Sequence, residues 1–357
     1  MNPLLQKLVC GLASASLFLS LGLAALADLT LPPSEYPSAT SNSSDFQFVP
    51  LLNYQEKPQG SALLKHTPRV VLALGGGGMR GAAHVGVLKV LVKEGIPIDG
   101  IAGTSMGSVV GGLYAAGMPL SEIETRFVNG SMMKSFTPIP VLARLMLVPI
   151  TSSPRLIGFH PYEGLYAGNA FKHYLQKAVP KDKTTIESLN IPFVAVAIDL
   201  CDGHVYSIQK GNLVNAMRAS SAVPGLRKPI PIDDKLFVDG GYLANLPVPH
   251  ARALGGDVVI AVQIDEPFKV ETQNDFRKLG SVEERMFNLQ LSAFDAVHAR
   301  KADILIHPSL DRIGLVSTKI SDAKRAIAAG EAAAEEALPA IKEKLQAFGI
   351  ATKPGTI

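Results

Sequence analysis

The sequence has little cysteine, and this shortage excludes one class of metal site. Cys10 and Cys201 are the two cysteines among 357 residues. A structural zinc site needs four protein ligands, so a site built from four cysteines is impossible here. The chain also has no visible internal repeat.

Clustered positive charge is also missing. The formal net charge is +3, and no Lys/Arg-rich run with interleaved aromatic residues occurs. We therefore expect no nucleic-acid partner. Hydrophobic residues make up 47% of the chain and charged residues 18%. This composition and length allow a sizeable core in one large α/β domain or two small ones.

The N-terminal residues have the pattern of a secretory signal. Lys7 is the only charged side chain before Asp28, and the run between them is rich in Leu and Ala. The run ends in Ala25-Leu26-Ala27, a small-x-small cleavage pattern. We expect residues 1–27 to be a signal peptide and the protein to be exported, to the periplasm or the medium, with membrane association open.

Two alternatives remain for this segment, and a linker follows it. About 20 apolar residues can span a bilayer, so an uncleaved anchor is one alternative. Lipid modification at Cys10 is the other. Residues 28–66 are rich in proline and small polar residues. They are expected to form a flexible linker, with a few apolar residues docked on the domain. The folded domain is expected at 67–350.

Strand and helix patterns alternate from residue 69 onward. Residues 70–74 are a continuous apolar run, typical of a strand buried on both faces. Helical spacing then extends from residue 82 toward Gly95, and a strand is expected at 96–102, followed by a helix at 105–116. A βαβα start of this kind indicates an α/β fold with a mainly parallel sheet.

Further elements are expected along the rest of the chain. The helices are placed at 120–128, 164–177, 212–221 and 321–345, and the strands at 191–199, 205–208, 236–238, 258–264 and 304–307.

Gly103-Thr104-Ser105-Met106-Gly107 has the G-x-S-x-G form of a nucleophile elbow. In such an elbow a strand reverses sharply into a helix and leaves one serine exposed at the bend. Gly103 and Gly107 have no Cβ, so strand and helix can approach closely and Ser105 can adopt a strained backbone. Ser105 is therefore the candidate nucleophile.

The glycine run from Gly75 to Gly81 has several possible interpretations. Gly76-x-Gly78-x-x-Gly81 has the form of a dinucleotide fingerprint. That motif expects an acidic residue at the end of the second strand, whereas Asp99 lies nearer its start. A Walker A loop is excluded because no Gly-Lys-Ser/Thr follows. The remaining interpretations are a plain turn and an oxyanion hole, in which successive N–H groups meet negative charge.

A serine hydroxyl needs a base that takes its proton. His250, His298 and His307 follow Ser105 in the order expected for a Ser-His-Asp triad. The other candidate is Asp239, which directly follows a strand pattern and precedes Gly240 and Gly241. The carboxyl ends of strands are where α/β sheets place their sites. The residues alone leave both possibilities open.

Three blocks together resemble the signature of the patatin-like phospholipase family. They are Gly76-Gly77-Gly78-Met79-Arg80-Gly81, Gly103-Thr104-Ser105-Met106-Gly107 and Asp239-Gly240-Gly241. Two flanking stretches, Ala219-Ser220-Ser221-Ala222-Val223-Pro224 and Asn245-Leu246-Pro247, are also similar to family segments. Gly75 departs from the family, because many members carry an aspartate there.

The resemblance implies both a fold and a site. The fold would be a three-layer α/β/α sandwich with a mainly parallel central sheet. Ser105 and Asp239 would form a catalytic dyad. Gly76, Gly77 and Gly78 would form the oxyanion hole, with the N–H groups of Gly77 and Gly78 as donors, and Arg80 would lie nearby.

We therefore expect a serine acyl hydrolase that cleaves fatty-acyl esters of phospholipids or other lipids without a metal or cofactor. Its partner would be a lipid or membrane-surface substrate. The alternatives are a carboxylesterase with a histidine triad, and a non-catalytic module that binds lipid or nucleotide. The apolar stretch 142–150 is either a lid or acyl-chain groove, or ordinary core.

Overall fold

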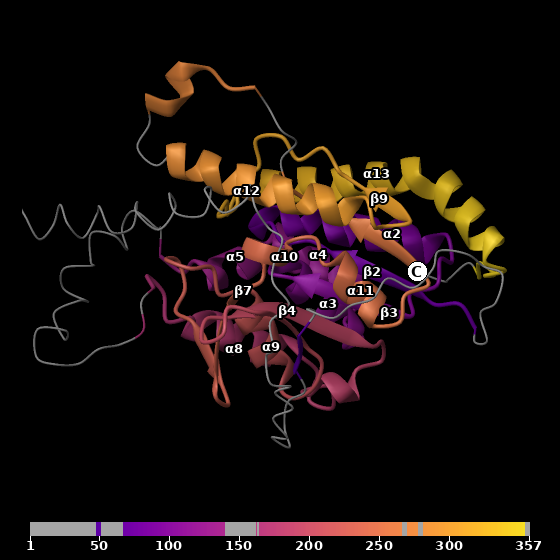
Figure 1. The fold of residues 1–357 in the computed structure, drawn as a ribbon, viewed down its shortest axis with the longest axis horizontal. Coiled ribbons are helices and arrows are strands. Elements are labelled where there is room, and N and C mark those ends of the chain that lie inside the picture. The colour runs from indigo at the N-terminus through magenta and orange to yellow at the C-terminus, as the bar shows by residue number, and fades with distance from the viewer. Residues whose placement is uncertain are drawn as a thin grey trace, which may run out of the picture. The chain divides into compact units, whose positions relative to one another are not determined.

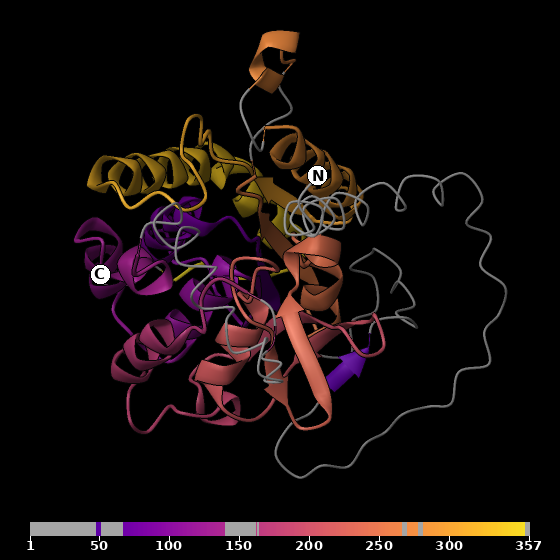
Figure 2. The same ribbon diagram turned by 90° about the vertical axis from the view of Figure 1, so that its left-hand side faces the viewer.

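The structure is a computed structural model that describes residues 48–50, 67–139, 162, 164–265, 270–277 and 281–353. The expected signal peptide, most of the expected linker and the apolar stretch 142–150 lie outside these residues. Within the linker, Phe48–Pro50 form the short strand β1, which pairs with β5 at the edge of the sheet (Figure 2).

A central sheet organises the described residues (Figure 1). Its main path runs β1-β5-β4-β3-β2-β8-β9, and the hairpin β6–β7 joins at β4. The neighbours from β4 to β9 along this path pair in parallel, whereas β1, β5, β6 and β7 pair antiparallel. The strands are β2 Val70–Leu74, β3 Gly100–Thr104, β4 Phe193–Asp199, β5 Val205–Ile208, β6 Ile230–Ile232, β7 Lys235–Asp239, β8 Val258–Val262 and β9 Ile304–Ile306.

Helices cover both faces of the sheet. The α-helices are α2 Ala82–Lys93, α3 Met106–Ala115, α4 Leu120–Val128, α5 Ser131–Phe136, α8 Asn169–Ala178, α9 Leu213–Ser220, α10 Gly241–Ala244, α11 Val248–Ala253, α12 Ser281–Ala299 and α13 Ile320–Ala347. The 3-10 helices are η4 Gly78–Gly81, η6 Ile186–Ser188 and η7 Gln273–Arg277.

The two faces of the central strands β2, β3, β4 and β8 belong to two cores. Val70, Leu72 and Leu74 pack into the large core with α2, α3, α9 and α13, whereas Val71 and Ala73 pack against α11. Side chains alternate between faces along a strand, so a strand covered on both sides is apolar throughout. The expected three-layer α/β/α architecture with a mainly parallel centre is therefore confirmed.

Most of the expected elements are present, with shifted ends. The strand expected at 96–102 is β3, Gly100–Thr104. It begins later because Asp99 ties the preceding loop to β2: its Oδ2 accepts from Val70 N at 2.8 Å and its N donates to Val70 O at 2.8 Å. The helix expected at 164–177 begins at Asn169, because Gly168 precedes it with a left-handed φ of 78°.

Helices α5, α10 and α12 are absent from the sequence-based expectations. Among the described residues, no helix is both long enough and apolar enough to cross a bilayer.

Candidate active site

Ser105 lies at the bend between β3 and α3. Its backbone has φ 51° and ψ −122°, a conformation that a residue with a side chain rarely adopts and that stores strain. The bend is tight: a Cβ on Gly107 would lie 2.2 Å from Leu74 O, which real structures do not allow. Ser220 secures the bend, because its Oγ accepts from Ser105 N at 3.0 Å and donates to Val196 O at 2.6 Å. The predicted elbow is present.

Asp239 ends β7 and reaches Ser105 directly. Ser105 Oγ donates to Asp239 Oδ2 at 2.6 Å, and Gly241 N donates to Oδ1 at 2.8 Å. Asp239 is 3% exposed. Burial raises the pKa of Asp239 to about 6, although the hydrogen bonds from Ser105 and Gly241 oppose that rise. Above this pH the group is a carboxylate in contact with the serine hydroxyl, as a base requires.

The glycine loop lies against Ser105. A Cβ on Gly76 would come within 2.9 Å of Ser105 Cβ and 2.6 Å of Asn245 Oδ1, so a larger residue has no room. Gly76 N donates to Asn245 Oδ1 at 3.2 Å. Within the described residues, the N–H groups of Gly77 and Gly78 have no hydrogen-bond partner. Both glycines line the cavity that also contains Ser105.

Arg80 follows the loop in η4 and is 4% exposed. Its Nε donates to Ile313 O at 2.7 Å, and Met79 N donates to Leu315 O at 2.9 Å. The guanidinium thus fastens the segment between β9 and α13 to the glycine loop. The expected place of Arg80 near the serine is consistent with this geometry, because Arg80 also lines the cavity described next.

A cavity of about 120 Å³ opens on Ser105 and Asp239. Its polar wall includes the glycine loop, Arg80, Tyr242, Asn245 and Asp265. Its apolar wall consists of Met106, Phe136, Val223, Leu226, Leu291, Leu315 and Val316. A few convergent polar groups on an otherwise apolar wall suit a ligand with one polar centre and an apolar tail.

The histidines of the alternative triad do not line this cavity. His250 Nδ1 lies 2.7 Å from Ser207 Oγ, and burial lowers the pKa of His250 to about 3. Burial also lowers the pKa of His298. His307 Nε2 lies 3.4 Å from Asp265 Oδ1. The described contacts of Ser105 Oγ therefore favour Asp239 over these histidines as the base.

His84, on α2, supports the glycine loop from behind. Its Nε2 donates to Gly75 O at 2.8 Å, and burial lowers the pKa of His84 to about 4, so the ring is neutral at pH 7.

The glycines at the ends of the motifs make close contacts. A Cβ on Gly81 would lie 2.3 Å from Met106 Cγ, one on Gly103 2.6 Å from Gly107 O, and one on Gly240 2.5 Å from Val196 O.

Sequence reasoning assigned no role to three residues of this site: Ser220, Asn245 and Asp295. Ser220 and Asn245 stand in the two flanking stretches whose similarity to the family is visible in the sequence. Asp295 lies on α12 and carries no motif. Its buried side chain accepts a hydrogen bond from Asn245 Nδ2 at 2.7 Å, a contact that depends on tertiary structure.

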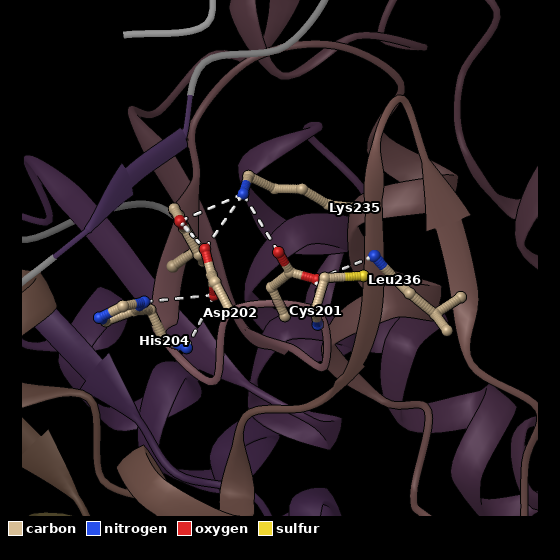
Figure 3. A network of polar contacts seen from close by, with 7 residues as sticks. Cys201, Asp202, His204, Lys235 and Leu236 are labelled. Carbon is tan, nitrogen blue, oxygen red and sulfur yellow. Dashed lines mark hydrogen bonds and ion pairs between the residues drawn. The ribbon is translucent and has the colours of Figure 1, made fainter. Parts of the chain in front are cut away.

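A second polar cluster lies at the turn between β4 and β5 (Figure 3). Lys235 Nζ lies 3.1 Å from Asp199 Oδ2 and 3.3 Å from Asp202 Oδ2, and Tyr206 OH donates to Asp202 Oδ2 at 2.5 Å. Asp199 Oδ1 also accepts from Leu236 N at 2.9 Å. These contacts join the β4–β5 turn to β7, and none of the residues lines the cavity.

Comparisons with known proteins agree with the signature blocks. The sequence model described as patatin-like phospholipase matches residues 72–252. An uncharacterized NTE family protein of Mycobacterium tuberculosis is 39% identical over 199 residues, which cover 56% of this chain and 50% of that protein. Patatin-like phospholipase domain-containing protein 6 of Homo sapiens is 36% identical over 199 residues, which cover 55% of this chain and 13% of that protein.

The chain thus matches half or less of the length of these curated relatives. Among solved structures, VipD from Legionella pneumophila aligns with a TM-score of 0.42 and 15% sequence identity, over 77% of this chain and 67% of that one.

Proposed function

The chain belongs to the patatin-like phospholipase family, and we propose that it is a serine acyl hydrolase that cleaves fatty-acyl esters of phospholipids. Membership supports a lipid hydrolase. The observation that supports a serine mechanism is the 2.6 Å contact between Ser105 Oγ and Asp239 Oδ2, two residues that line a largely apolar cavity.

The first half of the reaction forms an acyl-enzyme. Asp239 takes the proton of the Ser105 hydroxyl as Oγ attacks the ester carbonyl carbon. The carbonyl oxygen becomes an oxyanion, which the N–H groups of Gly77 and Gly78 receive. Asp239 then gives its proton to the leaving alcohol oxygen, the C–O bond breaks, and the lysophospholipid departs.

The second half regenerates the serine. Asp239 takes a proton from a water molecule that attacks the acyl carbon, and the same two N–H groups receive the second oxyanion. The Ser105 Oγ–acyl bond breaks, Oγ takes back the proton, and a fatty acid is released. A carboxylate is a weaker base than imidazole, so the oxyanion donors carry more of the rate, at about 3–4 kcal/mol for each donor.

Product analysis tests this function. The full chain is incubated with dispersed phospholipids and lysophospholipids, and released fatty acid is measured by mass spectrometry. We expect fatty acid from the wild type and none from Ser105→Ala. Equal release by the two proteins, or release of a phosphorylated head group instead of a fatty acid, would contradict the proposal.

We also propose that the protein is exported, because residues 1–27 have the pattern of a signal peptide. N-terminal sequencing of the protein recovered from its cells should begin at Asp28. A first residue of Met1 in exported material would argue for the uncleaved anchor.

A further inference from the structure

A buried carboxylate outside the matched family region reaches the glycine loop through one side chain. Asp295, on α12, is 0% exposed. Its Oδ2 accepts from Asn245 Nδ2 at 2.7 Å, and its Oδ1 accepts from Leu246 N at 2.8 Å. Asn245 Oδ1 in turn accepts from Gly76 N at 3.2 Å. Asp295 is thus two hydrogen bonds away from the loop.

The charge of Asp295 determines how the Asn245 amide is oriented. An ionised carboxylate only accepts hydrogen bonds, so the NH₂ group of Asn245 must face Asp295. The amide oxygen then faces the N–H of Gly76. The reversed amide would place two donors against each other at Gly76. That N–H would then keep only its longer bond to the backbone carbonyl Asn245 O, at 3.4 Å.

The glycine loop has no room to adjust to a reversed Asn245 amide without moving. Gly76 is wedged between Asn245 and Ser105, since a Cβ there would lie 2.6 Å from Asn245 Oδ1 and 2.9 Å from Ser105 Cβ. The same end of α10 also holds the elbow, because Thr104 Oγ1 donates to Ala244 O at 2.8 Å. Turning the amide over would therefore displace the adjoining N–H of Gly77 relative to Ser105.

We propose that ionised Asp295 is a positioning residue, which holds Asn245 and, through it, the glycine loop in the arrangement that receives the oxyanion. This inference rests on the proposed function, and it adds a residue on α12 that touches neither substrate nor Ser105.

Protonation of Asp295 would release this arrangement. Burial and the carboxylate of Asp265, which follows β8, raise the pKa of Asp295 to about 7, against the bonds from Asn245 and Leu246 and against His307, which follows β9. On α12 itself, His298 lies one turn along. Because Leu246 N occupies Oδ1, the added proton lies on Oδ2, where it opposes the NH₂ of Asn245 and favours the reversed amide.

The pH dependence of hydrolysis follows from this effect of protonating Asp295. Hydrolysis should fall as the pH drops through about 7, before Asp239 itself becomes protonated near pH 6. Asp295→Asn reproduces the protonated form at every pH with nearly the same shape. We expect its kcat at pH 8 to fall about 10-fold, less than the 10²–10³-fold loss of an oxyanion donor, with KM nearly unchanged. In this variant, the fall of hydrolysis on the acid side of the pH profile (the acid limb) should shift to lower pH, toward the pKa of Asp239.

Exchanging the two side chains gives a rescue. Asn245→Asp alone places two carboxylates face to face and should also lose activity. In the double variant Asp295→Asn with Asn245→Asp, the new amide donates to the new carboxylate, which accepts from Gly76 N. The double variant should therefore exceed Asp295→Asn in kcat by several-fold, a pattern that separate losses of stability would not produce.

Asp199→Asn is the matched control, since Asp199 is also buried and accepts from two backbone N–H groups but lies in the β4–β5 cluster. It should lower the melting temperature without changing the acid limb. Amide hydrogen exchange at Gly76 is a readout independent of hydrolysis, and it should speed up in Asp295→Asn and recover in the double variant.

The positioning role would be overturned if Asp295→Asn showed the same exchange rate at Gly76 and the same pH profile as the wild type. A wild type that releases no fatty acid would instead remove the proposed function, while exchange at Gly76 would still test the contact between Asp295, Asn245 and the loop.

Discussion

Replacing Asp239 by asparagine should inactivate the protein and stabilise it at the same time. The asparagine has the same shape and can keep the hydrogen bond from Gly241 N to Oδ1. Its NH₂ group then faces Ser105 Oγ, so the hydroxyl loses its acceptor. A general base contributes about 10²–10⁴-fold, so we expect kcat to fall by that factor in the fatty-acid release assay.

The gain in stability follows from the pKa of Asp239. Burial raises it from 3.8 to about 6, so the folded state holds its proton more tightly than the unfolded state does. Stability is therefore lost as the pH rises from about 4 to 6, and it stays lower above that range. A pKa difference of about two units lowers the free energy of unfolding of the wild type by about 3 kcal/mol at high pH. A neutral asparagine does not ionise, so the variant does not lose this free energy.

Urea unfolding at pH 8 measures this difference directly. The free energy of unfolding of Asp239→Asn should exceed that of the wild type by up to about 3 kcal/mol, and the excess should disappear near pH 4. A variant that is inactive and also less stable at pH 8 would refute the reasoning, because its inactivity would then reflect a damaged fold.

Three further changes test the site. Gly76→Ala should abolish hydrolysis, because the new Cβ would lie 2.6 Å from Asn245 Oδ1, whereas Gly314→Ala, with nothing within 4 Å, should leave activity unchanged. Ser220→Ala removes the acceptor of Ser105 N and should lower kcat about 10-fold. Its circular dichroism spectrum should match that of the wild type. Lys235→Met should lower the melting temperature but not kcat, because it disrupts only the β4–β5 cluster.

The sequence predicts the fold well where local pattern and tertiary structure agree. The apolar run at Val70–Leu74 is a strand because both its faces are covered, and the helix at Leu120–Val128 shows clear amphipathic spacing. The sequence pattern places the start of β3 too early, because Ile96 and Ile98 continue the apolar run. In the structure, hydrogen bonds through Asp99 end the loop, and the strand begins at Gly100.

The candidate site is predictable only where glycine motifs mark it. The blocks around Gly76, Ser105 and Asp239 stand out because close backbone contacts exclude larger residues. Asp295 could not be found in this way. It is a single aspartate on a helix of ordinary composition, and its contact with Asn245 joins positions that lie 50 residues apart.

The proposed mechanism requires that Asp239 activates Ser105 without a histidine, and covalent labelling with a fluorophosphonate tests this directly. Intact-mass and peptide analysis should find the label on Ser105 in the wild type and in His250→Ala, and labelling should be strongly slowed in Asp239→Asn. Labelling of Asp239→Asn at the wild-type rate, or loss of labelling in a folded His250→Ala, would contradict the account.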